Sequence, residues 1–257
     1  FTSTRKKMKI GIAGYGFVGQ AHELIFKDYH DILISDPDKG HYADLTHADA
    51  IIICVSTPAG SNGSCKMDNV YEVIEAAPDV PILIKSTISV EGWKMLKHVF
   101  PYSNLTFSPE FLRAAHWRED ALSTTQHYLG GSGTQFWADL FLKALGNISI
   151  DIAEPEELVV AKSVRNNFLA LKVSFFNQIF DYCQVHNLDY HSVADIVGAD
   201  DRIGHSHTQI TDERGFGGHC FPKDVKALIT SAKAYGCSLS LLEEASNYNN
   251  RVRKDQV

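Results

Sequence analysis

The stretch KIGIAGYGFVG (residues 9–19) decides the fold, because an apolar strand leads directly into a glycine turn and the start of a helix. Gly14, Gly16 and Gly19 allow a tight turn, close approach of the backbone to a pyrophosphate and close packing of helix on strand. A second strand ends at Asp36, where a carboxylate can bind the ribose hydroxyls of NAD and repels the 2′-phosphate of NADP. The segment predicts an NAD site, with a purely structural glycine turn as the alternative. The cofactor contacts that it predicts are Gly14, Gly16, Phe17, Val18, Gly19 and Asp36.

Short β-branched runs alternate with helical segments through the first 152 residues. We expect strands at 9–14, 31–35, 50–57, 81–87, 104–108, 127–131 and 148–152, with helices between most of them, as at 18–28 and 135–146. Such alternation is typical of a doubly wound parallel sheet covered by helices on both faces. We therefore predict an α/β fold in which residues 1–152 form a Rossmann-type NAD-binding domain.

Helical periodicity dominates the rest of the chain. Residues 154–187 keep it for more than thirty residues, with Pro155 suited to the first turn. Shorter helices are expected at 189–198, 222–235 and 238–251, with a loop at 199–219. We predict that residues 153–257 form an all-helical domain. The apolar face of its long helix is wider than a small domain can cover, which predicts a homodimer through helix 154–187.

Composition narrows the class of protein. The 257 residues include 24 Lys+Arg and 31 Asp+Glu, a net charge of −7, which argues against a nucleic acid or an anionic membrane as the main partner. No apolar run approaches the roughly 20 residues that cross a bilayer, and residues 8–14 have the pattern of a strand, not of a secretion signal. Five cysteines without a C-x-x-C pair favour a reducing compartment, so we expect a cytoplasmic protein.

A second motif, GFGGHCFPKD (residues 215–224), places a cysteine where it can react. Cys220 follows three glycines in four positions, which leaves the thiol little steric cover. Pro222 is suited to start a helix, whose N-terminal potential stabilises a nearby thiolate. Lys223 and Asp224 add a cation and a potential base. The alternative is a flexible loop that contains a cysteine by chance.

This motif resembles the active-site signature of the UDP-glucose/GDP-mannose dehydrogenase family. Blocks similar to the family's other segments follow in family order: VSTP (55–58), KST (85–87), SPEFLR (108–113), AKSVRNNFLALK (161–172) and DRIG (201–204). The resemblance implies oxidation of a nucleotide sugar's C6 alcohol to a carboxylate with two NAD+, with UDP-glucose as the expected substrate and UDP-glucuronate as the product. Alternatives are a UDP-N-acetylmannosamine or GDP-mannose 6-dehydrogenase, or a catalytically idle NAD-binding dimeric homologue.

The resemblance also implies roles for single residues. Cys220 would form a thiohemiacetal and then a thioester, and Lys162 and Asn166, four apart on one helix face, would stabilise charge on the C6 oxygen. Asp224, Thr87 and Glu110 would hold the hydrolytic water. Further cofactor contacts implied are Ser56, Thr57, Pro58 and Thr87. Substrate contacts implied are Glu110, Phe111, Leu112, Arg113, Lys162, Asn166, Gly215, Phe216, Gly217, Gly218 and, from the partner subunit, Arg202.

Simpler interpretations exist for several of these residues. Lys162 and Asn166 fit a solvated helix face, and Glu110 fits the cap of a helix that begins at Phe111. Thr87 fits a strand-end hydroxyl without a catalytic role. His205, His207 and His219 have no carboxylate or thiol at ligand spacing except Cys220, so we predict no metal site.

Three departures from the family pattern qualify these expectations. Only 14 residues (37–50) separate Asp36 from the next apolar strand, too few for a full crossover, so the third parallel strand of the first half is expected to be missing. A family glutamate that approaches the nicotinamide is Ala114 here. The sequence also stops where the family continues into a domain that grips the nucleotide, so we expect this chain alone to bind UDP-sugars poorly.

Overall fold

The structure is a computed structural model that describes residues 7–58, 60, 65–218 and 220–254. The chain divides into two compact units, the first formed by residues 1–58 and 65–162 and the second mainly by residues from 163 onward. The division falls within the long helix α6 (Pro155–Val185), which contributes its first residues to one unit and the remainder to the other.

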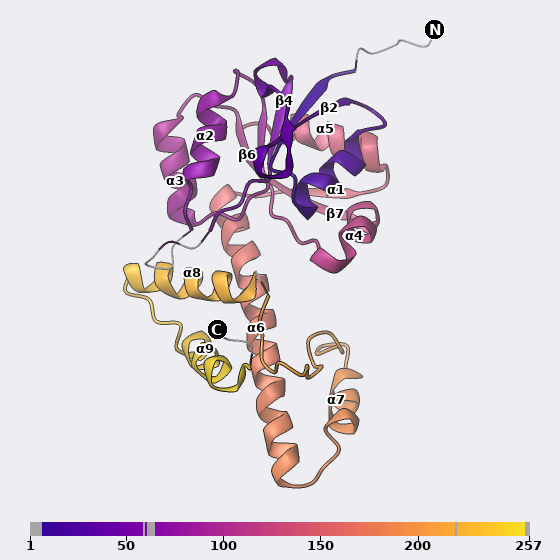
Figure 1. Cartoon of the computed structure of the whole chain (residues 1–257), viewed down its shortest axis with the longest axis vertical. Coiled ribbons are helices and arrows are strands. Elements are labelled where there is room, and N and C mark those ends of the chain that lie inside the picture. The colour runs from indigo at the N-terminus through magenta and orange to yellow at the C-terminus, as the bar shows by residue number, and fades with distance from the viewer. Residues whose placement is uncertain (1–6, 59, 61–64, 219, 255–257) are drawn as a thin grey trace. The chain divides into compact units, whose positions relative to one another are not determined.

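A sheet forms the centre of the first unit (Figure 1). It has eight strands in the order β3-β2-β1-β4-β5-β6-β7-β8. The strands are β1 (Lys9–Ala13), β2 (Asp31–Asp36), β3 (His41–Tyr42), β4 (Ala50–Ile53), β5 (Ile82–Ile84), β6 (Leu105–Phe107), β7 (Gln126–Gly131) and β8 (Ser149–Ile152). Neighbouring strands are parallel except at two pairs, β2–β3 and β6–β7. The predicted α/β class with a Rossmann-type sheet is confirmed. Periodicity did not indicate the two antiparallel pairs, because it reports burial and not strand direction.

Helices cover both faces of this sheet, as the strand sequences require. On one face lie α1 (Phe17–Phe26), α4 (Trp117–Ser123) and α5 (Thr134–Leu145), and on the other α2 (Asp68–Ala76) and α3 (Val90–Val99) (Figure 1). The alternation within β4 shows why: Ile51 and Ile53 pack toward α2 and α3, whereas Ala50 and Ile52 pack toward α1 and α5. All four side chains are fully buried, so a strand of this kind carries no polar face.

The segment between β2 and β4 is shortened. In residues 37–49, all of which the structure describes, only two single-turn 3-10 helices and the two-residue strand β3 are found. Strand β3 occupies the place beside β2 that a third parallel strand takes in a full Rossmann sheet, and it runs antiparallel. The expected loss of that parallel strand is therefore confirmed.

The second unit is helical. After α6 it contains α7 (Tyr190–Gly198), α8 (Phe221–Ala234) and α9 (Ser240–Val252), each within two residues of the bounds that the sequence predicts. Its apolar core has two parts, one around Phe216 and Val225 and the other around Phe176 and Tyr190. No helix among the described residues is both long enough and apolar enough to cross a membrane.

Candidate functional site

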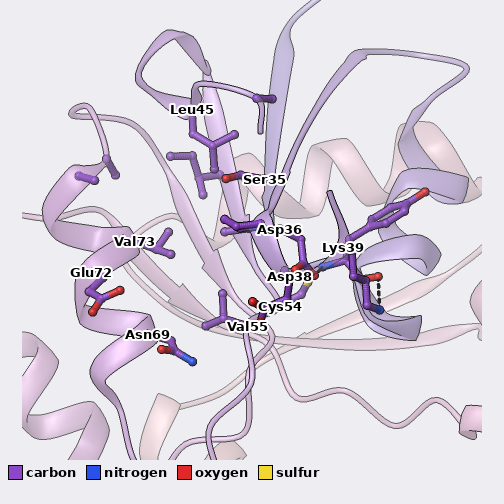
Figure 2. A pocket seen from close by; sticks show the side chains of 18 of the residues that line it. Ser35, Asp36, Asp38, Lys39, Leu45, Cys54, Val55, Asn69, Glu72 and Val73 are labelled. Atoms are coloured by element: carbon purple, nitrogen blue, oxygen red, sulfur yellow. Dashed lines mark hydrogen bonds between the residues drawn. The ribbon is translucent and has the colours of Figure 1, made fainter. Parts of the chain in front are cut away.

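A cavity of about 790 Å³ opens at the carboxyl ends of β1, β2 and β4 in the first unit. Gly14, Gly16 and Ser56 line it. Asp36 lines it as well (Figure 2). It lies where the strand order reverses between β1 and β4, the position at which open α/β sheets bind ligands. Four of the predicted cofactor contacts therefore surround one cavity.

Each of the three glycines in the turn has a different geometric role. Gly14 has a φ of +88°, and a Cβ there would lie 2.7 Å from the backbone of Cys54. A Cβ on Gly19 would lie 2.2 Å from the carbonyl oxygen of Gly14, so only glycine lets α1 approach β1 this closely. A Cβ on Gly16 would meet nothing within 4 Å, which leaves open space beside the first turn of α1 for a ligand phosphate.

Asp36 is tied to the glycine turn. Its Oδ2 accepts a hydrogen bond of 2.6 Å from the Tyr15 backbone N–H, and Lys39 Nζ donates to the Tyr15 carbonyl oxygen at 2.8 Å. The carboxylate is thereby fixed at the cavity wall and still has a second oxygen for a ligand. Asp38 and Asp44 also line the cavity, so several carboxylates oppose a further phosphate there.

The opposite wall of the cavity comes from α2. Asn69, Glu72 and Val73 line it, across from Asp36 and Lys39 in Figure 2. Our sequence reasoning named no residue of α2 as a site residue. The sequence does contain a pattern that indicates this helix: the buried positions Val70 and Ile74 have helical spacing, and this spacing places Val73 on an adjacent face.

Side-chain hydroxyl groups connect the two segments that follow β4 and β5. The β-branched runs predicted strands at 50–57 and 81–87, but β4 ends at Ile53 and β5 at Ile84. Beyond these ends Thr57 Oγ1 donates to Thr87 O at 2.6 Å and Ser86 Oγ donates to Val55 O at 2.7 Å. Side chains thus replace the strand ladder there. Among the described residues, Thr57, Pro58 and Thr87 do not line the cavity, nor do Phe17, Val18 and Gly19.

Glu110 does not cap a helix at Phe111, because the next helical turn begins only at Ala114. Its Oε1 accepts hydrogen bonds from the backbone N–H groups of Phe111 and Leu112, at 2.8 and 3.0 Å. Its Oε2 lies 3.2 Å from Nζ of Lys85. Burial opposes ionisation of this carboxyl, but the Lys85 ammonium and these N–H groups outweigh it and lower the pKa of Glu110.

Lys85 belongs to the KST block (residues 85–87), but from the sequence we assigned it no role in the candidate site. Its Nζ also lies 3.0 Å from Ser108 Oγ and 3.3 Å from the Pro109 carbonyl oxygen, so its three N–H donors meet three oxygen atoms. Two histidines line the same small cavity as Lys85 and Glu110. Burial, with Lys85 nearby, lowers the pKa of both His22 and His127 to about 4.

In the second unit, Cys220 is an exposed cysteine and the residue immediately before α8. Asp224, one turn later, is buried, and its Oδ2 accepts a hydrogen bond of 2.6 Å from Nδ2 of Asn166 on α6. The other oxygen of Asp224 lies 3.3 Å from Nζ of Lys223. The structure thus brings together Asn166 and Asp224, which the sequence placed 58 residues apart.

Comparison with known proteins shows what this chain is similar to. Residues 157–251 match the UDP-glucose/GDP-mannose dehydrogenase family, central domain. The UDP-glucose 6-dehydrogenase of Campylobacter jejuni is 28% identical, over 96% of this chain and 73% of that protein. That of Rickettsia bellii is 29% identical, over 80% of this chain and only 50% of that protein. Residues 157–251 thus match that family's central domain, and the chain is similar to UDP-glucose 6-dehydrogenases over most of its length.

A solved structure shares the fold. The UDP-glucose dehydrogenase from Pyrobaculum islandicum matches with a TM-score of 0.84 at 23% identity, over 98% of this chain and 70% of that one. The two chains therefore have the same fold over nearly the whole length of this one.

Four further residues that the family resemblance concerns are Lys162, Arg113, Arg202 and Ala114. Nζ of Lys162 lies 5.4 Å from the centre of the Phe111 ring, within the first unit. Arg113 is bound to Asp120 and Arg202 to Asp200, both in exposed ion pairs. Ala114, where the family has a glutamate, is exposed and begins a 3-10 turn.

The remaining predictions concern the glycine loop and metal binding. Gly215 and Phe216 are buried, whereas Gly217 is half-buried and Gly218 is exposed. Within the part of the chain that the structure describes, no group of three or more His, Cys, Asp or Glu side chains is arranged to hold a metal ion. His219 lies outside the described residues.

Proposed function

We propose that this chain is the NAD-binding and catalytic part of a nucleotide-sugar 6-dehydrogenase that oxidises the C6 alcohol of UDP-glucose to the carboxylate. The observation that carries the proposal is an exposed Cys220 at the start of α8, with Asp224 one turn later bound by Asn166. The names of the relatives, UDP-glucose 6-dehydrogenases, support UDP-glucose as the substrate.

The residues around the cavity in the first unit fit NAD. The open backbone at Gly16 would hold the pyrophosphate beside the N-terminus of α1, and Asp36 would accept hydrogen bonds from the adenosine ribose. Asp38 and Asp44 on the same wall disfavour the additional phosphate of NADP. When bound, NAD+ would supply the acceptor for two hydrides, one molecule for each oxidation step.

In the proposed reaction the alcohol first loses a hydride and a proton to become an aldehyde. The Cys220 thiolate then adds to the aldehyde carbon to give a thiohemiacetal, from which a second hydride is removed to leave a thioester. Water attacks the thioester carbon and expels the thiolate. The sum is one alcohol, two NAD+ and one water, converted to one carboxylate, two NADH and three protons.

Other residues of the chain would assist these steps. Lys162 would stabilise negative charge on the C6 oxygen, and Asn166 would donate a hydrogen bond. Asp224 and Glu110 would orient and deprotonate the water, with Thr87 as a further ligand. The lowered pKa of Glu110 keeps its side chain ionised, and two backbone N–H groups fix the carboxylate, so it is suited to accept a hydrogen bond from the water.

The experiment that tests the function counts NADH formed per sugar consumed. We expect two NADH and the uronic acid with UDP-glucose. Preference for UDP-N-acetylmannosamine or GDP-mannose would instead assign another sugar within the class. Bound NAD without turnover on any of the three would identify the chain as a catalytically idle homologue. One NADH with released aldehyde would contradict participation of the thiol.

A cysteine variant tests the nucleophile directly. Cys220→Ala is expected to abolish acid formation while NAD affinity stays unchanged. Cys237→Ser is the matched control, since Cys237 is also exposed and lies in a turn after α8. Loss of NAD binding in Cys220→Ala, or full acid formation by it, would overturn the assignment.

We further propose a homodimer through α6. Val164, Phe168, Phe175 and Tyr182 are 50 to 62% exposed on this helix, although they are large and apolar or aromatic. Their spacing of four and seven residues places them along one stripe. Sedimentation at micromolar concentration should give the dimer mass, and Phe168→Glu should give the monomer. A wild-type monomer would contradict this assignment and the role of Arg202 across subunits.

A further inference from the structure

Side chains from α9 hold the backbone of the loop that precedes Cys220. The amide of Asn249 makes two hydrogen bonds with Phe216: Oδ1 accepts from its N–H at 2.6 Å and Nδ2 donates to its carbonyl oxygen at 3.0 Å. The side chain thus pairs with Phe216 as a neighbouring β-strand would. Asn249 is only 2% exposed, so water cannot easily replace these bonds.

The residues just before Phe216 are held in the same way. Asn177 of α6 accepts hydrogen bonds from the Gly215 N–H at 3.0 Å and from Nε of Arg214 at 2.8 Å. Nη1 of Arg253, directly after α9, donates to the carbonyl oxygens of Arg214 and Gly215 at 2.9 and 3.4 Å. Every polar backbone group from the Arg214 carbonyl to the Phe216 carbonyl therefore has a side-chain partner.

The fit around this loop leaves little room for another conformation. A Cβ on Gly215 would lie 2.2 Å from Oδ1 of Asn249, and one on Gly217 would lie 2.3 Å from Nη2 of Arg253. Arg214 has a φ of +63°, a region that residues other than glycine seldom adopt, and Gly215 follows it with a φ of +54°. The Phe216 side chain is 4% exposed and packs with Val225 of α8.

We propose that Asn249 is a positioning residue for Cys220. It fixes Phe216, four residues before the thiol, while the bond from Asn166 to Asp224 fixes α8, four residues after it. The backbone is thus held four residues before the thiol and four residues after it before substrate arrives. An anchored nucleophile adds to the aldehyde before the aldehyde can leave, because its orientation needs no further loss of entropy. This inference rests on the proposed function of Cys220.

The test compares Asn249→Leu, which keeps the number and branching of the side-chain heavy atoms and removes both hydrogen bonds, with Asn247→Leu at an exposed position of the same helix. We expect Asn249→Leu to lower acid formation about tenfold or more, to move NADH per sugar from two toward one, and to release aldehyde. NAD affinity should stay unchanged, since the proposed NAD cavity lies in the first unit. Amide exchange of residues 214–218 should become faster. Asn247→Leu should match the wild type in all five measurements.

Two results would overturn the inference: a folded Asn249→Leu that still forms two NADH per sugar, or unchanged amide exchange at residues 214–218. If Asn249→Leu fails to fold, the same measurements are made on Arg253→Met, which removes the hydrogen bonds to the Arg214 and Gly215 carbonyl oxygens. The same results are expected, and the same two results would contradict the inference. Failure of the proposed function is separately visible. In that case the wild type itself makes no acid, and the exchange rates alone decide whether Asn249 holds the loop.

Discussion

Nζ of Lys85 lies 3.2 Å from Oε2 of Glu110, with only 3% and 15% of the two side chains exposed. Removing one partner of a buried ion pair strongly destabilises the folded protein, because the other charge then stays buried without a counter-charge. Glu110 is also one of the predicted catalytic residues, so the same contact links the stability of the first unit to the state of its candidate base.

Replacing Lys85 with methionine should lower the free energy of unfolding of the first unit by about 3–5 kcal/mol, because Glu110 would be left buried without its partner. Urea denaturation monitored by fluorescence gives this value. The double variant Lys85→Met/Glu110→Gln should regain part of the loss. Lys94→Met, at an exposed position of α3, serves as the control. A change below about 1 kcal/mol in Lys85→Met would show that the pair has no such role.

Acid should destabilise the first unit through its buried histidines. His22 and His127 have their pKa lowered to about 4, so the unfolded chain binds protons below about pH 6.5 that the folded chain does not. The free energy of unfolding should therefore fall between about pH 6.5 and pH 4, by up to about 3 kcal/mol for each histidine.

The variant His127→Gln isolates this effect, since His127 Nε2 is buried without a hydrogen-bond partner. Its urea midpoint should depend less steeply on pH than that of the wild type over this range. The exposed His116→Gln should retain the wild-type slope. Equal slopes in all three proteins would exclude His127 as a source of the acid sensitivity.

Asp36 should determine the choice of dinucleotide. Asp36→Asn keeps an acceptor for the Tyr15 N–H but loses the charge that binds ribose hydroxyls and repels a phosphate. We expect NAD affinity to fall about tenfold and the preference over NADP to narrow. Titration calorimetry with both dinucleotides measures this. Asp79→Asn, at an exposed position outside the described cavity wall, should change neither affinity. An unaltered NAD/NADP ratio in Asp36→Asn would place the ribose elsewhere.

Asp224 should act on the last chemical step. Asp224→Asn preserves the size of the side chain and an acceptor for Asn166, but removes the base that would activate water. Acid release should slow by about a hundredfold or more, and a sugar adduct on Cys220 should accumulate and be visible in the intact mass. Asp212→Asn, in the exposed loop, should behave as the wild type. Slow turnover without an adduct would mean that Asp224 acts before the thioester forms.

The sequence by itself determined the features that depend on neighbouring residues. The turn from β1 into α1 was predictable because the strand, the glycines and the helix start lie within residues 9–19. The helices of the second unit were predictable within two residues, because helical periodicity and Pro155 are local signals. The short connection after Asp36 likewise excluded a third parallel strand by its length alone.

Only the tertiary structure decided which distant side chains meet. Four features depend on contacts between segments that are far apart in the sequence. They are the direction of β7, the cavity wall formed by α2, the Lys85–Glu110 ion pair and the hydrogen bonds between Asn249 and Phe216. Glu110 shows the reason: the sequence placed an acid after a proline, with a helix cap as the simpler alternative to a catalytic role, and did not indicate the buried cation of Lys85 beside it. Periodicity reports which face of an element is buried, but a pairing between polar side chains has no period and exists only once the chain has folded.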